Sequence, residues 1–196
     1  MSSSPSDLTD LDLHLFGEGN HHHIYQKLGA HVVSENGVRG TRFAVWAPNA
    51  KRVSVVGDFN AWDGRVNVMQ PRGSSGVWVT FVPGVEAGAL YKFEILTQHD
   101  HLLMKSDPYG FQMQLRPDNA SIVADIEGYE WGDAEWLARR REWNHLREPI
   151  SIYEFHPGSW RRSWHRQPAF LTWDEIADQL IPYVLDMGYT HVEIVG

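Results

Sequence analysis

The stretch GTRFAVWAPNAKRVSVVGDFNAWDGR, residues 40–65, decides the fold of this chain. Phe43 and Val45 point to one face of an alternating run, and Val53 and Val55 repeat the pattern after a Pro-Asn turn. Such alternation is typical of β-strands with one buried face. Turn residues bound both runs. The stretch therefore predicts two short strands of a β-sheet domain.

Further runs of the same kind follow at 77–84, 90–96 and 120–126, each short, rich in β-branched or aromatic residues, and bounded by Gly, Pro, Asn or Asp. Short strands at this spacing, with turn signals between them, are typical of an antiparallel sandwich. We therefore predict a β-sandwich over residues 40–126, preceded by a polar leader or capping segment over 1–39.

The periodicity changes beyond the sandwich. Residues 127–149 are rich in helix formers and predict a helical linker. Residues 150–196 read strand, loop, helix, strand, which is a β-α-β unit. Thr172 and Glu175 form a capping-box signature for its helix, and Gly188 suits its end. The predicted buried stripe is Ile176, Leu180 and Val184, and Pro182 is expected to kink or restart the helix.

A single β-α-β unit leaves sheet surface uncovered, and the chain stops at Gly196. A (β/α)8 barrel needs roughly 250 residues. We therefore expect residues 150–196 to be the first, truncated part of such a barrel. Uncovered apolar faces predict aggregation, self-association as a swapped dimer, or disorder in this region. They also predict proteolytic cleavage near residues 145–165.

The composition narrows the class of protein. The chain has 196 residues, a formal net charge of −8 and no cysteine. This charge disfavours a nucleic-acid partner, and the sequence shows neither a membrane span nor a signal peptide. A cytoplasmic location is expected.

His21, His22 and His23 lack further ligands at metal-binding spacing, so we expect them to be surface residues. No metal and no cofactor are expected. Nine Trp and seven Tyr suggest sugar-binding surfaces as well as core aromatics.

Five motifs in order resemble the N-terminal part of bacterial 1,4-α-glucan (glycogen) branching enzymes. They are KLGAH at 27–31, the stretch 40–65 quoted above, LYKFEIL at 90–96 with KSDPYGF at 105–111, RPDNASIV at 116–123, and ISIYEFHPGSWRR at 150–162. Pro157 departs from the leucine usual in that family, and the final HVEIVG departs from its usual continuation.

The resemblance implies a mainly β fold: an immunoglobulin-like starch- and glycogen-binding sandwich followed by the start of a family-13 α-amylase-type barrel. It also implies glycogen biosynthesis, in which an α-1,4-glucan is cut and rejoined as an α-1,6 branch with retention. Retention uses two carboxyl groups. The family's catalytic carboxylates come after later barrel strands, and no residue of this sequence matches them. The chain is therefore expected to carry no catalytic residue and to be inactive alone.

Glu154 and Glu193 lie in the two strands of the β-α-β unit. A retaining pair needs carboxyl groups about 5–5.5 Å apart, and neighbouring parallel strands allow that distance. A half-formed barrel offers no pocket to hold a sugar, however. These glutamates are expected to pair with arginines or with backbone groups instead.

The resemblance also implies sites for α-1,4-glucan on the sandwich. Trp62 matches a stacking tryptophan, Lys92 a lysine in the YKF-like strand, and Asn119 an asparagine before the last strand. A second tryptophan is missing, and Leu102 or Leu103 stands near its place. The alternative for Trp62 is a plug between domains.

Three functions remain open at this point. The first is an N-terminal portion of a branching enzyme. The second is a stand-alone α-glucan-binding module, against which the β-α-β unit argues. The third is a piece of a related debranching or trehalose-releasing hydrolase, which the YEFHPGSW and KLGAH motifs disfavour.

Overall fold

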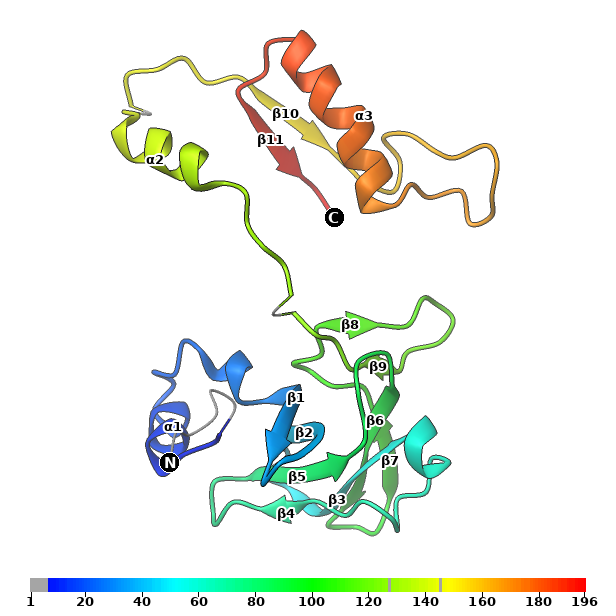
Figure 1. Ribbon diagram of the computed structural model, residues 1–196. Coiled ribbons are helices and arrows are strands. Elements are labelled where there is room, and N and C mark those ends of the chain that lie inside the picture. The colour runs from blue at the N-terminus through cyan, green and yellow to red at the C-terminus, as the bar shows by residue number, and fades with distance from the viewer. Residues whose placement is uncertain (1–6, 127, 145) are drawn as a thin grey trace. The chain divides into compact units, whose positions relative to one another are not determined.

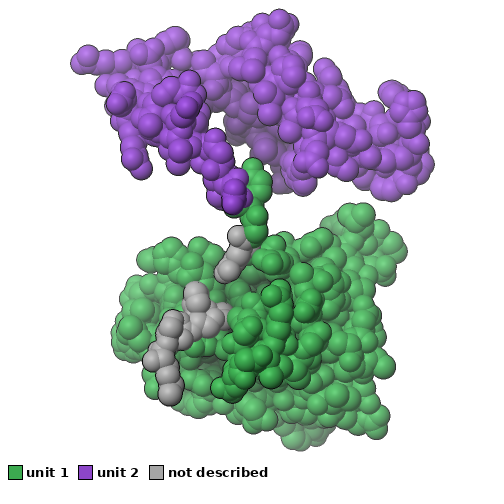
Figure 2. Space-filling model, in the orientation of Figure 1, with its two compact units in different colours: residues 1–129 green, residues 130–196 purple. Residues whose placement is uncertain are grey.

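The computed structural model describes residues 7–126, 128–144 and 146–196. They form two compact units, residues 1–129 and 130–196, coloured separately in Figure 2. Within the described residues, no helix combines the length and the apolar character needed to cross a membrane. The proposed division at residues 39, 126 and 149 stays a prediction.

The first unit is a sandwich of two antiparallel sheets (Figure 1). One sheet has the order β1-β2-β5-β4; the other has the order β3-β6-β9-β8, with β7 also paired to β6. The strands are β1 (Gly29–Glu35), β2 (Val38–Trp46), β3 (Ala50–Gly57), β4 (Gln70–Pro71), β5 (Val77–Pro83), β6 (Leu90–Thr97), β7 (Leu102–Lys105), β8 (Gln112–Met113) and β9 (Ser121–Ile122). The predicted mainly β fold is confirmed. Strand β1, which lies before residue 40, also belongs to the sandwich because it pairs with β2.

The sandwich core lies between the two sheets. The residues predicted from alternation, Phe43 and Val45 on β2 and Val53 and Val55 on β3, are all buried there. On β6, Phe93 faces Val55 across the ladder and is fully buried with them. Burial of apolar surface is the dominant favourable term in folding, so this cluster stabilises the unit.

A short helix, α1 (Asp10–Gly17), and a 3-10 turn, η1 (Ile24–Gln26), precede the first strand. Leu8 and Leu28 are buried beside Ala44 and Val77 of the first sheet, in a cluster separate from the sandwich core. The N-terminal segment therefore packs on the sandwich. Thr9 caps α1, because its side chain accepts from the Asp12 N–H while the Asp12 carboxylate accepts from the Thr9 N–H.

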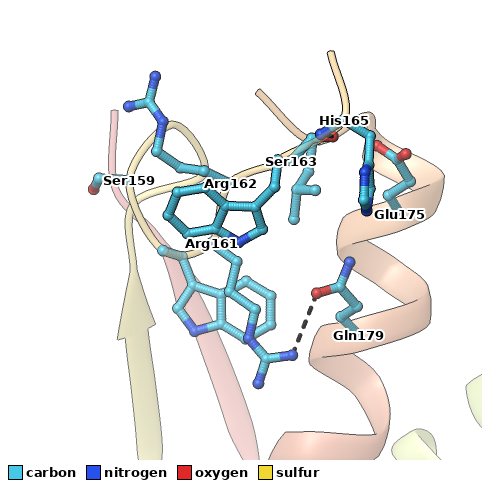
Figure 3. Close-up of a pocket in the computed structure, with 10 residues that line it drawn as sticks. Ser159, Arg161, Arg162, Ser163, His165, Glu175 and Gln179 are labelled. Carbon is cyan, nitrogen blue, oxygen red and sulfur yellow. Dashed lines mark hydrogen bonds between the residues drawn. The ribbon is translucent and has the colours of Figure 1, made fainter. Parts of the chain in front are cut away.

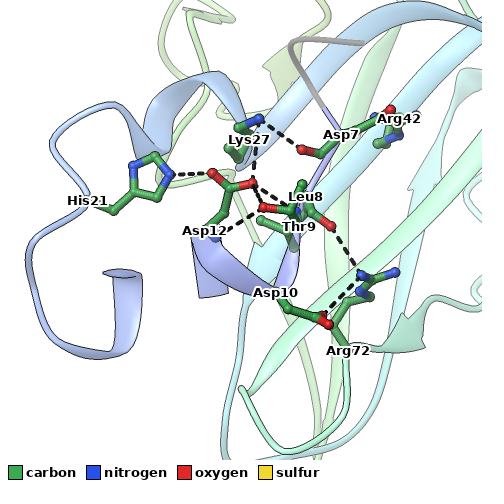
Figure 4. Close-up of polar contacts among 9 residues, drawn as sticks. All are labelled: Asp7, Leu8, Thr9, Asp10, Asp12, His21, Lys27, Arg42 and Arg72. Atoms are coloured by element: carbon green, nitrogen blue, oxygen red, sulfur yellow. Dashed lines mark hydrogen bonds and ion pairs between the residues drawn. The ribbon is translucent and has the colours of Figure 1, made fainter. Parts of the chain in front are cut away.

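Asp12 ties this segment together (Figure 4). His21 Nε2 lies 2.8 Å from Asp12 Oδ1, and Lys27 Nζ lies 3.6 Å from Asp12 Oδ2. His21 is largely buried, so the prediction that all three histidines are surface residues is wrong for it; His22 and His23 are exposed. Burial alone would raise the pKa of Asp12, but hydrogen bonds from Thr9 and His21 and the charge of Lys27 lower it to about 2.

We expect Asp12→Asn to destabilise the chain at neutral pH. The lowered pKa means that the carboxylate's contribution is complete above pH 3.8 and is lost as the pH falls toward about 2. A shift of this size corresponds to about 2 kcal/mol. The free energy of unfolding, measured with urea at pH 7 and pH 3, should therefore differ less between the two pH values for Asp12→Asn than for wild type. Asp10→Asn, on the exposed side of α1, is the control; an equal loss in both variants would contradict this role.

The second unit begins with α2 (Ala134–Glu142). The sequence predicted a longer helix that included both Trp136 and Trp143. Trp143 instead takes an extended conformation as the C-cap, and it stacks on His191 with ring centroids 5.8 Å apart. The ring contact within the unit replaces the predicted continuation of the helix.

The rest of the second unit is the predicted β-α-β unit. Strand β10 (Ile152–Phe155) pairs in parallel with β11 (His191–Ile194), and α3 (Trp173–Asp186) connects them. Thr172 caps α3 as predicted, and Gly188 ends it with a left-handed φ of 76°. The predicted stripe is buried against Phe155, whereas Ile152, Val192 and Ile194 of the strands remain exposed. Pro182 lies inside α3, which continues past it, so the helix does not restart there, and the alternative of a kink stays a prediction.

Candidate glucan-binding face of the sandwich

Trp62 is held in an unusual backbone conformation by the loop after β3. Ala61 and Trp62 both have left-handed φ values, 52° and 61°. This conformation is uncommon for residues other than glycine, and for a bulky residue it is a genuine outlier. The Trp62 N–H donates to the Gly57 carbonyl at 3.0 Å, and its indole Nε1–H donates to Asp58 Oδ1 at 3.1 Å. Strain of this kind clusters at binding sites, where the surrounding structure maintains it.

Asn60 supplies the hydrogen bonds that shape the start of this loop. Its Oδ1 accepts from the Gly57 N–H at 2.9 Å, and its Nδ2 donates to the Val55 carbonyl at 3.0 Å and to Asn67 Oδ1 at 2.8 Å. One amide side chain therefore links the end of β3 to the returning part of the loop. Short polar side chains of this type favour turns because they satisfy nearby backbone groups.

The end of the loop crosses the outer face of β6. Gly64 is buried, and a Cβ atom at this position would lie 2.0 Å from Glu94 Oε1. Glu94 and Lys92 are two residues apart on one strand, so they share a face of the sheet. Trp62 lies two residues before Gly64 in the same loop, and Lys92 lies on the face that Gly64 contacts. Asp63 and Arg65 brace the same turn, and hydrogen bonds from Arg65 lower the pKa of Asp63 to about 2.

The structure brings Lys92 and Asn119 into direct contact. Lys92 Nζ donates to Asn119 Oδ1 at 2.5 Å, and the Ser106 hydroxyl donates to the Asn119 carbonyl at 2.5 Å. Lys92 is half-buried and Asn119 is exposed. Two of the three residues predicted from the family motifs therefore form one polar pair at the surface of the second sheet.

The register of β7 identifies which side chains lie where the missing second tryptophan is expected. Met104 pairs with Glu94 and Leu102 with Leu96, so both share the face of Lys92. Leu103 pairs with Ile95 and lies on the opposite face. All three are exposed. The sequence offered Leu102 or Leu103 and overlooked Met104, which stands closer to Lys92 along the ladder.

A buried polar network supports this face from below. Tyr91, next to Lys92, donates its hydroxyl to Asp107 Oδ2 at 2.6 Å, and the Tyr109 N–H donates to Asp107 Oδ1 at 2.8 Å. The Asp107 N–H donates to Ser121 Oγ at 2.9 Å. Burial raises the pKa of Asp107 and outweighs both hydrogen bonds; burial and the neighbouring carboxylate raise the pKa of Tyr91. The network fixes the link from β7 to β9 that positions Asn119.

Glu154 and Glu193 face each other across the parallel pair of β10 and β11. Both are exposed, so neither carboxyl group is enclosed as a sugar-cleaving pair would require. In the part of the chain that the structure describes, no cluster of His, Asp or Glu could hold a metal ion.

Part of the sandwich matches a known family model. Residues 27–110 match the family model of carbohydrate-binding module 48 (isoamylase N-terminal domain). The match covers β1 to β7 and includes both Trp62 and Lys92. It ends before Asn119.

The chain is also similar to 1,4-alpha-glucan branching enzymes GlgB. The protein of Marinobacter nauticus is 54% identical and that of Thermosynechococcus vestitus 50% identical, each over 95% of this chain. The chain spans only 29% and 27% of those relatives' lengths. The resemblance predicted from the five motifs is confirmed.

Solved structures show the same fold at low sequence identity. PulA from Klebsiella pneumoniae, in a maltotriose complex, has a TM-score of 0.61 at 18% identity and covers 87% of this chain and 20% of its own. The pullulanase of Paenibacillus barengoltzii has a TM-score of 0.57 at 19% identity, and the match covers 87% of this chain and 27% of the pullulanase chain. At this sequence identity, the two structures show a shared fold and nothing about function.

Proposed function

We propose, on the premise that 95% of this chain is similar to the first part of much longer branching enzymes, that its sandwich binds α-1,4-glucan. In this proposal the chain is the N-terminal portion of a cytoplasmic enzyme of glycogen biosynthesis. It holds the polysaccharide for a reaction that cuts an α-1,4 link and forms an α-1,6 branch. The chain alone is expected to lack that activity in an iodine-stain assay.

The observation that supports the proposal is the polar pair of Lys92 and Asn119 at the surface of the second sheet. The Lys92–Asn119 pair lies on the sheet face that the Trp62 loop crosses at Gly64. An aromatic ring packs on the C–H face of a sugar, and nearby donors select its hydroxyl groups. Met104 supplies a weaker, more adaptable apolar contact than a second indole.

We expect Trp62→Ala to weaken binding of glycogen about tenfold, which corresponds to roughly 1.4 kcal/mol. Affinity electrophoresis through glycogen-containing gels measures the change. Lys92→Ala and Asn119→Ala should weaken binding in the same assay, because each removes half of the polar pair. The melting temperature of Trp62→Ala should stay close to that of wild type.

The matched control is Trp46→Ala, which removes a 51% exposed tryptophan from β2, on the other sheet. It should leave glycogen affinity unchanged. If Trp62→Ala lowers the melting temperature and spares the affinity, Trp62 is a structural plug and the proposal fails.

A stand-alone binding module is the second candidate, since the sandwich packs its own core. The exposed Ile152, Val192 and Ile194 of the β-α-β unit disfavour it, because a binding module has no use for them. Self-association through this surface stays a prediction, which sedimentation of the purified chain tests.

A further inference from the structure

The loop between β10 and α3 carries an unexplained exposed tryptophan. Trp164 is 91% exposed, although tryptophan is highly buried on average. The loop follows the carboxyl end of β10, and ligands of open α/β sheets bind outside the carboxyl ends of the strands. Trp164 is far from the sandwich in sequence and belongs to the second compact unit.

The loop that carries Trp164 is held by hydrogen bonds on both sides of the ring. Arg162 and Phe170 form an isolated β-bridge, and the Ser163 N–H donates to the Ala169 carbonyl at 2.9 Å. Arg166 donates to the Phe170 carbonyl and makes two hydrogen bonds to the Glu175 carboxylate, of which the Nη1–Oε1 bond measures 3.0 Å. A ring on a braced loop costs less ordering entropy when a ligand binds it.

Trp164 lines an open cleft of about 640 Å³ between this loop and α3. Figure 3 shows Arg161, Arg162, His165 and Gln179 around it. Arg161 Nη1 donates to Gln179 Oε1 at 3.3 Å, and its guanidinium also lies 4.4 Å from the Trp160 ring centroid. The wall therefore combines an exposed aromatic face with amide, imidazole and guanidinium groups.

This combination suits a neutral polyhydroxylated chain. An indole face packs on sugar C–H groups, and donors and acceptors in one wall match hydroxyl groups, which both donate and accept. An anionic ligand fits less well, because the guanidinium of Arg161 is engaged by Gln179 and the Trp160 ring, and that of Arg162 by the Phe170 ring. We propose that the cleft is a second α-glucan contact of this chain, with Trp164 as the stacking platform and His165 and Gln179 as hydroxyl partners. This inference rests on the proposed function for its ligand class.

The test measures binding of maltoheptaose by calorimetry, and of amylopectin by affinity electrophoresis, with the full 196-residue chain. Trp164→Ala should lower the affinity several-fold and remove one of two binding events. Trp164→Phe, which keeps an aromatic face, should restore much of the affinity. Trp173→Ala is the control, since this 67% exposed tryptophan begins α3 but does not line the cleft.

The outcomes separate this inference from the proposed function. Binding that falls with both Trp62→Ala and Trp164→Ala, and vanishes in the double variant, supports both. Binding that depends on Trp62 alone overturns the second contact and leaves the sandwich site standing. Binding that depends on Trp164 alone supports the second contact and overturns the sandwich site. A wild-type chain that binds neither glucan overturns both.

Discussion

Gly57→Ala is expected to destabilise the sandwich by about 3 kcal/mol, at the upper end of the usual cost of overpacking. A Cβ atom at Gly57 would lie 2.1 Å from the Leu90 carbonyl oxygen and 2.5 Å from Cε1 of Phe59. The carbonyl belongs to the backbone of the neighbouring strand β6, so it cannot move without opening the ladder between β3 and β6. For a domain of about 100 residues, a loss of this size lowers the melting temperature by roughly 10–20 °C.

Gly57→Ala should also weaken glycogen binding, because the Gly57 carbonyl accepts the Trp62 N–H and its N–H donates to Asn60. The control is Gly128→Ala, where no atom lies within 4 Å of the added Cβ. Calorimetric melting of both variants measures the difference. A Gly57→Ala chain that melts within 2–3 °C of wild type, a shift corresponding to less than about 1 kcal/mol, would show that the two strands can separate at little cost.

Leu180→Ala is expected to release α3 from the β-α-β unit, at a cost of about 2–5 kcal/mol. Leu180 is only 6% exposed and belongs to a small cluster with Phe155, Ile176 and Val184. Within the described residues of the second unit, these four are the only buried apolar side chains, so the loss of one removes much of its core. Limited proteolysis should then cut residues 150–196 faster, while the sandwich melts as in wild type.

Leu185→Ala is the matched control: it makes the same change on the same helix at a residue that is 69% exposed. Surface substitutions of this kind change stability by about 0.5 kcal/mol or less. Equal rates of proteolysis for the two variants would contradict the packing of α3 on β10. They would also remove the support for the Trp164 loop, which Glu175 of α3 braces.

Alternation alone was enough to predict the central strands. Phe43, Val45, Val53 and Val55 lie on long strands with one face in the core, and their burial follows directly from the period of two. The strand β7 escaped prediction because its residues 102–105 are all exposed and so carry no alternation to detect. Its register, which brings Met104 to the face of Lys92, depends on pairing with β6 and not on its own sequence.

The polar contacts were harder to predict because they also depend on how distant parts of the chain pack together. His21 meets Asp12 across a turn between α1 and η1, a contact set by tertiary packing that no local spacing encodes. The left-handed backbone of Trp62 was equally hidden, since propensity places Gly or Asn in such a conformation. Lys92 and Asn119 were named from family motifs, and only the fold brings the two side chains within hydrogen-bonding distance.

The hydrogen bond between Lys92 and Asn119 gives the proposed binding face a polarity of its own. The bond takes one lone pair of Asn119 Oδ1, the side-chain acceptor of the pair, and one of the three N–H donors of the Lys92 ammonium group. What the two side chains retain is mainly N–H groups. An incoming molecule is therefore selected for lone pairs, which the hydroxyl and ring oxygens of a glucan supply in a regular series. A group that only donates hydrogen bonds, such as an ammonium ion, finds few acceptors at this pair.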